Sequence, residues 1–188
     1  MWRYMDLYKA LRPPVKTWAA KAGMKRVTSS PPAYTRLAGE RHLSLWIQQS
    51  SGGFDSMLGG HFTVNLQLGM YQGIGSHLVA GRSDALITHR VDSTWDEKTS
   101  KRALELHNRI VTKRRRPPPG TPHFLGGIMS PENIERRYYL PIAALPMDYW
   151  LPFMDEDDGA AWGAFLTETL DQSFDTFLAK VHRPNPWR

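Results

Sequence analysis

The chain has 188 residues, of which 41% are hydrophobic, so it is long enough for one domain with a sizeable core. It has no cysteine, which excludes disulfides, thiolate nucleophiles and cysteine-ligated zinc or iron–sulfur sites. Its formal net charge of +6 favours an acidic partner, such as a nucleic acid or an acidic protein, although a charge of this size also serves solubility alone.

The N-terminal residues 1–6 lack the apolar segment of a signal peptide. No stretch of the chain approaches the roughly 18 apolar residues that a membrane span requires. The sequence therefore predicts a soluble cytoplasmic protein that has no membrane contact.

A helix is expected over residues 2–23, because apolar residues recur there at three- and four-residue steps and Gly23 can end it. Pro13 and Pro14 predict a kink or a break within this helix. Two strands follow, over residues 33–37 and 41–49. Residues 38–40 would join them as a hairpin.

The clearest strand signal covers residues 61–71, where apolar and polar side chains alternate. Such alternation is typical of an antiparallel strand with one buried face. A flexible loop, Ser50-Ser51-Gly52-Gly53, is expected before this strand, and a weaker strand over residues 85–91 after it.

Residues 95–111 are expected to form a helix, with Ser93 or Thr94 as its N-cap. The last helix begins at the acidic residues 155–158, which face the positive end of the helix dipole, and Pro184 ends it.

The segment between these two helices, residues 113–146, is rich in proline and lacks periodicity. It is expected to be a long loop with one short strand over residues 136–141. Together the elements predict a single α+β domain over residues 1–188, with a proline-rich basic insertion at about 113–146. Its antiparallel sheet of about four to five strands would be packed by the N-terminal and C-terminal helices.

No complete catalytic or cofactor motif is present. The glycine clusters complete neither a P-loop nor G-x-G-x-x-G, and no serine lies in G-x-S-x-G. The seven histidines show no metal-ligand spacing, and His42, His61 and His89 converge only if the sheet aligns them. The sequence therefore predicts no cofactor, no metal ion and no enzymatic activity.

Trp46 is a candidate binding residue, because it lies on the polar side of its predicted strand beside Gln48 and opposite Asn65. A large aromatic side chain among polar ones is typical of a binding surface. The alternative is that helices cover both faces of the sheet and bury Trp46 in an ordinary core.

The run Lys113-Arg114-Arg115-Arg116, followed by three prolines, is predicted to be a mobile, exposed cationic arm. Such an arm can dock on phosphates or on an acidic protein surface. The alternative is a solvated charge run within a loop.

Several short segments carry a family pattern. Gln48-Gln49-Ser50 matches Gln-x-Ser, residues 62–66 match Phe-Thr-hydrophobic-Asn-hydrophobic, and Arg90 lies in a later strand. Over about residues 5–110 and 148–181 the chain thereby resembles the bacterial family called domain of unknown function 4304. The basic segment 113–145 departs from that family.

This resemblance implies an α+β fold with an antiparallel sheet and no established activity. It singles out Gln48, Asn65 and Arg90, which offer hydrogen bonds and a fixed charge but no nucleophile. Such groups suit recognition of a carboxylate, a phosphate or a peptide backbone. They can equally satisfy one another and fix the register of the strands.

The leading interpretation is a non-enzymatic protein-binding domain of a bacterial conflict system, such as an immunity or antitoxin-type protein that neutralises a toxin with an acidic surface. One alternative is a nucleic-acid-binding accessory protein that uses residues 113–116. Another is a hydrolase with a dispersed histidine and acid site. The candidate partner-binding residues are Trp46, Gln48, Asn65, Arg90, Lys113, Arg114, Arg115 and Arg116.

Overall fold

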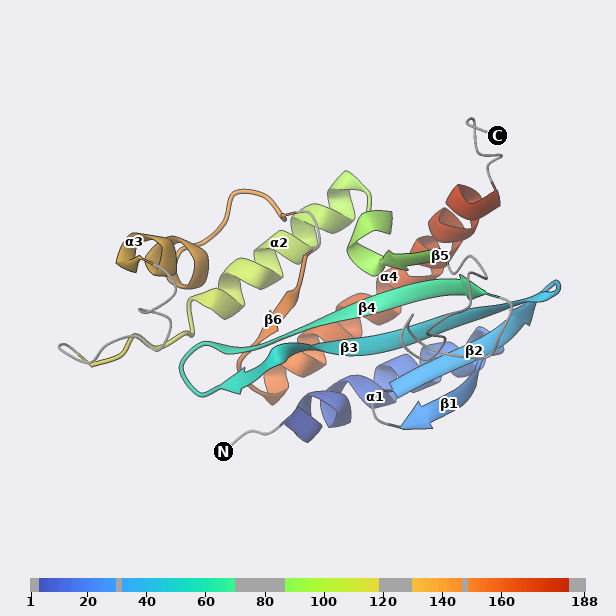
Figure 1. The fold of residues 1–188 in the computed structure, drawn as a ribbon, viewed down its shortest axis with the longest axis horizontal. Helices are drawn as coiled ribbons and strands as arrows, with labels where there is room; N and C mark the ends of the chain where they lie inside the picture. Colours follow the sequence, from blue (N-terminus) through green and yellow to red (C-terminus); the bar gives the residue numbers. More distant parts are fainter. Residues whose placement is uncertain (1–3, 30–31, 70–86, 119–129, 147–148, 183–188) are drawn as a thin grey trace.

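The computed structural model of the chain describes residues 4–29, 32–69, 87–118, 130–146 and 149–182 (Figure 1). Within these ranges, six strands form one antiparallel sheet: β1 (Lys25–Ser29), β2 (Pro32–Ala38), β3 (Arg41–Asp55), β4 (Gly59–Gly69), β5 (Ile87–Arg90) and β6 (Leu151–Phe153). The helices are α1 (Tyr4–Lys21), α2 (Glu97–Val111), α3 (Pro131–Ile134) and α4 (Glu156–His182), with the short 3-10 turn η2 (Val91–Thr94) and the π-helical turn η3 (Glu135–Tyr139).

The sheet follows the order β1-β2-β3-β4-β5, and β6 pairs with the beginning of β4. Helices α1 and α4 run along one face of this sheet, side by side (Figure 1). The predicted α+β class, with an antiparallel sheet packed by the N-terminal and C-terminal helices, is therefore confirmed. The sheet has more strands than expected, because neither β1 nor β6 was predicted.

The apolar core lies between the helices and one face of the sheet. Alternate residues of β3 up to Ile47, and of β4 from Phe62, point into it, as the alternation predicts. The strand residues of this core are Leu43, Leu45, Ile47, Phe62, Val64, Leu66 and Leu68. Facing them, α1 and α4 contribute Leu7, Leu11, Val15, Trp18, Trp162, Leu166, Leu170 and Phe177. Burial of each large apolar side chain contributes about 1.5–3 kcal/mol, so this layer is the main source of stability.

Helix α1 continues through Pro13 and Pro14, so the predicted break into two helices does not occur. Pro14 packs against α4 at Gly163, where an added Cβ would lie 2.7 Å from the proline Cγ. The glycine therefore allows the two helices to approach closely at this point.

The expected loop at residues 50–53 is wrong, because these residues belong to the long strand β3. The turn comes later, where Asp55 Oδ1 accepts hydrogen bonds from the backbone N–H groups of Met57 and Leu58, at 2.7 and 2.8 Å. The chain therefore turns at an aspartate whose side chain closes the turn, and not at the glycine-rich residues that composition suggested. The register of β3 against β4 shifts between Gln49 and Phe54, which absorbs the glycines as an irregularity within the strand.

Two further expectations are wrong, one about the cap of a helix and one about a strand. The N-cap of α2 is Asp96, whose carboxylate accepts from Thr99 N–H at 2.7 Å, whereas Ser93 and Thr94 lie in η2. In place of the expected strand over residues 136–141, the structure has α3 and η3.

Parts of other predicted elements lie outside the described residues: positions 2–3 of the first helix, positions 70–71 and 85–86 of two strands, and Pro184. No helix in the described ranges combines the length and the apolarity needed to cross a membrane.

Candidate functional site

Three of the predicted site residues lie side by side on the second face of the sheet, the face opposite the helices. The strand register pairs Trp46 of β3 with Asn65 of β4, and Asn65 with Arg90 of β5. Gln48 lies on the same face, and its Oε1 accepts a hydrogen bond from Asn65 Nδ2 at 3.3 Å. The structure thus brings Trp46, Gln48, Asn65 and Arg90 into one neighbourhood.

These side chains are occupied by contacts within the molecule. Trp46 is only 6% exposed and packs with Ala33 and Val27, so it is not an exposed aromatic platform. The guanidinium of Arg90 lies 4.7 Å from the ring centre of Trp150. The geometry thereby favours the second alternative for Gln48 and Asn65, in which the polar groups satisfy one another and fix strand register. A role of this face in binding a partner stays a prediction.

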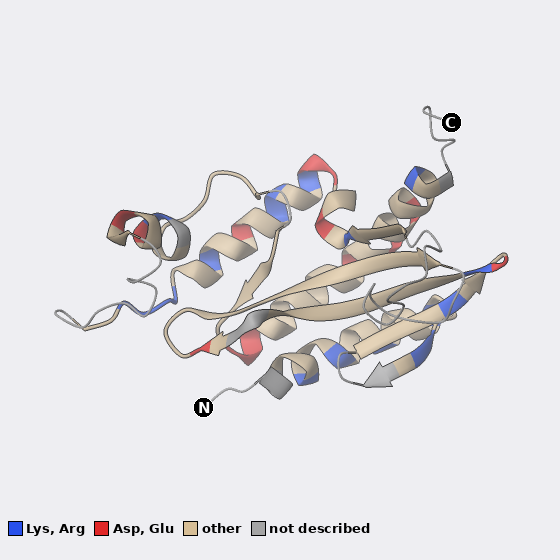
Figure 2. Ribbon diagram, in the orientation of Figure 1, with Lys and Arg blue, Asp and Glu red and all other residues tan. Residues whose placement is uncertain are grey.

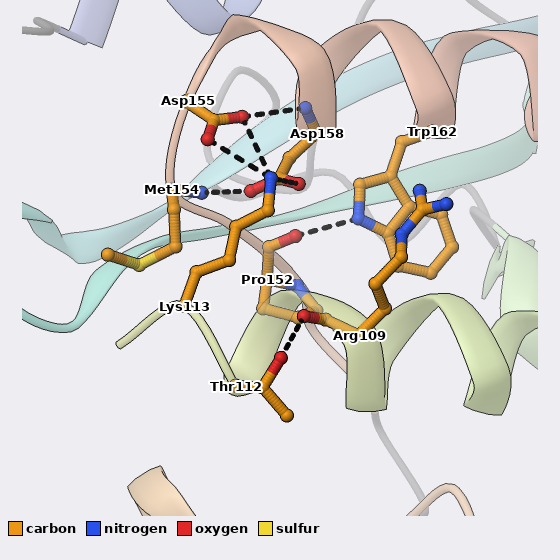
Figure 3. A network of polar contacts seen from close by, with 8 residues as sticks. All are labelled: Arg109, Thr112, Lys113, Pro152, Met154, Asp155, Asp158 and Trp162. Atoms are coloured by element: carbon orange, nitrogen blue, oxygen red, sulfur yellow. Dashed lines mark hydrogen bonds and ion pairs between the residues drawn. The ribbon is translucent and has the colours of Figure 1, made fainter. Parts of the chain in front are cut away.

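The basic run Lys113–Arg116 is held at the end of α2 by contacts with other elements. Lys113 Nζ contacts Asp158 at 2.6 Å and Asp155 at 3.1 Å (Figure 3). Burial lowers the pKa of Lys113, but the hydrogen bonds that its ammonium donates to both carboxylates outweigh this effect and raise the pKa above its ordinary value. Arg116 forms an ion pair with Glu135 of η3.

Arg114 is only 9% exposed, so the prediction of an exposed arm is wrong at this residue. It donates to the backbone oxygen of Tyr138 and to His61 Nε2, each at 2.9 Å. Burial lowers its pKa to about 10. At Arg115 the backbone N–H donates to Met57 O at 2.9 Å. The run therefore joins α2 to the β3–β4 turn and to η3, and a role in partner binding stays a prediction.

A buried histidine–tyrosine pair lies near Arg114, and sequence reasoning did not identify it. His107 of α2 and Tyr149 share a hydrogen bond of 2.8 Å between Nδ1 and Oη. Burial, with a contribution from Arg114, lowers the pKa of His107 to about 4. Burial also raises the pKa of Tyr149 well above its ordinary value, so both side chains are neutral at pH 7. No sequence motif joins these two positions, which lie far apart in the chain.

The strand histidines do not converge. His42 of β3 pairs with Gly69 at the end of β4, whereas His61 lies near the beginning of β4. The two positions are therefore about 27 Å apart along the strand direction. His89 lies on the helix side of the sheet, where its ring packs against Phe177 of α4. Within the described ranges, no group of three or more histidine and acidic side chains is arranged to hold a metal ion.

The main charge asymmetry lies elsewhere, in the first part of the chain. Residues 7–49 contain eight Lys and Arg but only one acidic residue, Glu40. We call the exposed members of this set the basic surface: Lys9, Lys16, Lys21, Lys25, Arg26, Arg36 and Arg41. Figure 2 shows basic positions along α1, β1 and β2 and at the β2–β3 turn. Leu37, at the same turn, is 66% exposed. Sequence reasoning missed this surface because its cations are dispersed rather than consecutive.

No family model matches the chain, no curated protein is significantly similar to it, and no solved structure matches it. The resemblance to the family called domain of unknown function 4304 therefore stays a prediction.

Proposed function

We propose that this protein is a non-enzymatic binding protein whose basic surface docks on an acidic surface of a protein partner. The biological role we propose for it is that of an immunity or antitoxin-type protein, which neutralises a toxin by covering it. The observation that carries the proposal is the ratio of eight basic residues to one acidic residue over residues 7–49, with seven of the eight cations exposed. Complementary charge of this kind accelerates association and selects partners.

The character of the basic surface favours a protein over a single-stranded nucleic acid. Proteins that bind single strands stack bases on exposed aromatic rings. The four aromatic residues of segment 7–49 are all buried: Tyr8, Trp18, Tyr34 and Trp46. The exposed Leu37, by contrast, is an apolar group that a protein partner can bury and that gains nothing from a phosphate backbone.

A charge-reversal pair tests which surface binds. The double variant Lys16→Glu/Lys25→Glu changes the basic surface. Lys98→Glu/Lys101→Glu makes the same change of net charge on exposed positions in α2. The probes are labelled poly-L-glutamate and a labelled single-stranded oligonucleotide, followed by fluorescence anisotropy at several salt concentrations.

We expect poly-L-glutamate to bind the wild type with an affinity that falls as salt rises. The Lys16→Glu/Lys25→Glu variant should bind it about tenfold more weakly, since two attractive charges become repulsive. The α2 variant should lose clearly less. Preference for the oligonucleotide at equal salt, equal losses in both variants, or no binding of poly-L-glutamate would contradict the proposal.

The proposed biological role needs the native partner. Tagged wild type and the two variants are used to capture partners from a nuclease-treated lysate of the source organism, and the captured protein is then expressed alone and together with this chain. We expect a protein that is lost with the Lys16→Glu/Lys25→Glu variant and that arrests growth unless the chain is co-expressed. A captured protein that is harmless when expressed alone would refute the immunity role.

A further inference from the structure

A hollow of about 260 Å³ lies where the end of α1, strand β2 and helix α4 meet. It is lined by Trp18, Ala22, Arg36, Asp171, Phe174 and Asp175. The volume is below the range of roughly 300–1,000 Å³ that is typical of drug-sized ligands, so it suits a smaller molecule.

Two of the lining residues are aromatic, and their positions are fixed. The ring centres of Trp18 and Phe174 lie 5.0 Å apart, and both residues are anchored in the apolar core. Trp18 Nε1 donates to Asp171 Oδ1 at 2.7 Å, which orients the carboxylate. The second oxygen of Asp171 has no hydrogen-bond partner among the described residues.

Two side chains of opposite charge on the wall of the hollow have no polar partner among the described residues. Arg36 and Asp175 are both exposed, and within the described residues neither side chain forms a hydrogen bond or an ion pair. A guanidinium and a carboxylate that pair with each other would satisfy both groups, but these two do not. They remain available to a ligand that enters the hollow.

We propose that this hollow binds a small zwitterion of the α-amino-acid class. The ligand carboxylate accepts hydrogen bonds from the Arg36 guanidinium, whose planar fork matches a carboxylate. The ligand ammonium donates to Asp175 and to the open oxygen of Asp171. The ligand side chain packs against the edge of the Trp18 and Phe174 rings.

The charge pattern selects a zwitterion over an ion of one sign. A simple cation would satisfy the two carboxylates but would lie beside Arg36. A simple anion would satisfy Arg36 but would face Asp171 and Asp175. Only a ligand with both charges satisfies the whole wall. Arg36 also belongs to the basic surface, but this inference rests on the residues that line the hollow and not on a protein partner.

The experiment is an NMR titration of the ¹⁵N-labelled protein with each of the twenty common amino acids at millimolar concentration. The reporter is the indole N–H signal of Trp18, which is assigned by its loss in Trp18→Phe. The best ligand is then compared with its amine analogue, which lacks the carboxylate, and its acid analogue, which lacks the amine. We expect the Trp18 signal to shift with the amino acid, and both analogues to bind at least about tenfold more weakly.

Two variants and two matched controls complete the test. Arg36→Gln and Asp175→Asn should each weaken amino-acid binding by at least about tenfold, because each removes one charged contact. Arg109→Gln and Asp157→Asn change exposed side chains outside the hollow and should leave the affinity unchanged. The dispersion of the NMR spectrum shows that each variant is folded. An amine analogue that binds as tightly as the amino acid, equal losses in the controls, or no shift of Trp18 with any amino acid would overturn the proposal.

Discussion

Asp158 is a buried carboxylate that joins three elements. It is 1% exposed, and it accepts hydrogen bonds from Met154 N–H at 2.9 Å and from Lys113 Nζ at 2.6 Å (Figure 3). Its neighbour Asp155 accepts from the Asp158 N–H at 3.0 Å. The end of α2 is thereby tied to the residues that lead from β6 into α4.

Replacing Asp158 by Asn should lower the free energy of unfolding by about 1–3 kcal/mol, because an amide cannot serve both a backbone N–H and an ammonium as well as a carboxylate does. Urea denaturation measures the change. The control Asp157→Asn alters an exposed acid in the same turn and should have little effect. Equal midpoints for the wild type and Asp158→Asn would show that the network is not stabilising.

His107 makes the stability of the protein depend on pH. Its pKa in the folded state is about 4, because of burial, against 6.5 for the ordinary residue. Between these values the unfolded chain binds the proton and the folded protein does not. Stability is therefore complete above pH 6.5 and falls as the pH is lowered toward 4, by up to about 3 kcal/mol.

The measurement is urea denaturation of the wild type and of His107→Gln at several pH values. The variant should be less stable at pH 7, where the hydrogen bond to Tyr149 is lost, but its stability should fall less between pH 6.5 and pH 4. If the two proteins lose the same amount of stability across this interval, His107 is not the group responsible.

At the residue scale, the sequence predicted which side chains share a face but not which ones touch. Alternation places Trp46, Gln48 and Asn65 on one side of their strands. It leaves the register open, because a shift of two residues preserves the same pattern. The contacts of Lys113 were beyond sequence reasoning for another reason, since Asp155 and Asp158 lie more than forty residues away along the chain.

Gly59 allows β4 and β6 to pair, because it has no side chain at a point where the two strands lie close together. Its φ of +74° is in the left-handed region, and an added Cβ would collide with the backbone oxygen of Phe153 and lie 2.6 Å from Met154 Sδ. Gly39, in the β2–β3 turn, has a similar φ of +63° but nothing within 4 Å of its added Cβ. A side chain at Gly39 would thus meet backbone strain alone, whereas a side chain at Gly59 would meet both backbone strain and a steric collision.

Gly39→Ala should cost about 1–2 kcal/mol, which is the strain of a left-handed alanine. Gly59→Ala should cost clearly more, because the strand pairing between β4 and β6 must also shift. Thermal or urea denaturation of both variants compares them directly. Similar losses would show that β6 moves away at little cost.

At the scale of elements, long alternating or periodic segments were predictable and short ones were not. Strand β6 has three residues and includes Pro152, so no periodicity marks it. Strand β1 begins with Lys25 and Arg26, whose charge suits the edge of a sheet but hides a strand from a pattern of apolar residues. Helix α3, in contrast, carried a usable signal, because Ser130 caps it and Pro131 is its first residue.

The whole molecule depends on α4 to cover the apolar face of the sheet. Helix α4 contributes Trp162, Leu166, Leu170 and Phe177 to the core. A chain truncated after residue 155 should therefore expose that face, bind a dye such as anilinonaphthalene sulfonate and aggregate, whereas the full chain should not. Size-exclusion chromatography and dye fluorescence measure both effects. A monomeric truncated chain that does not bind the dye would show that α1 alone suffices as a cover.

The position of α4 after the sheet in the chain also has a consequence for synthesis on the ribosome. Strand β4 ends at Gly69 and α4 begins at Glu156, a separation of 87 positions (156 − 69). At translation rates of about 5–20 residues per second, the synthesis of α4 begins about 4–17 s after β4 is complete. During this interval only α1 can cover the apolar face of the nascent strands, so the part of that face that α4 covers in the folded protein stays exposed. The length of this exposure depends on the order of the elements in the chain and not on the final stability of the protein.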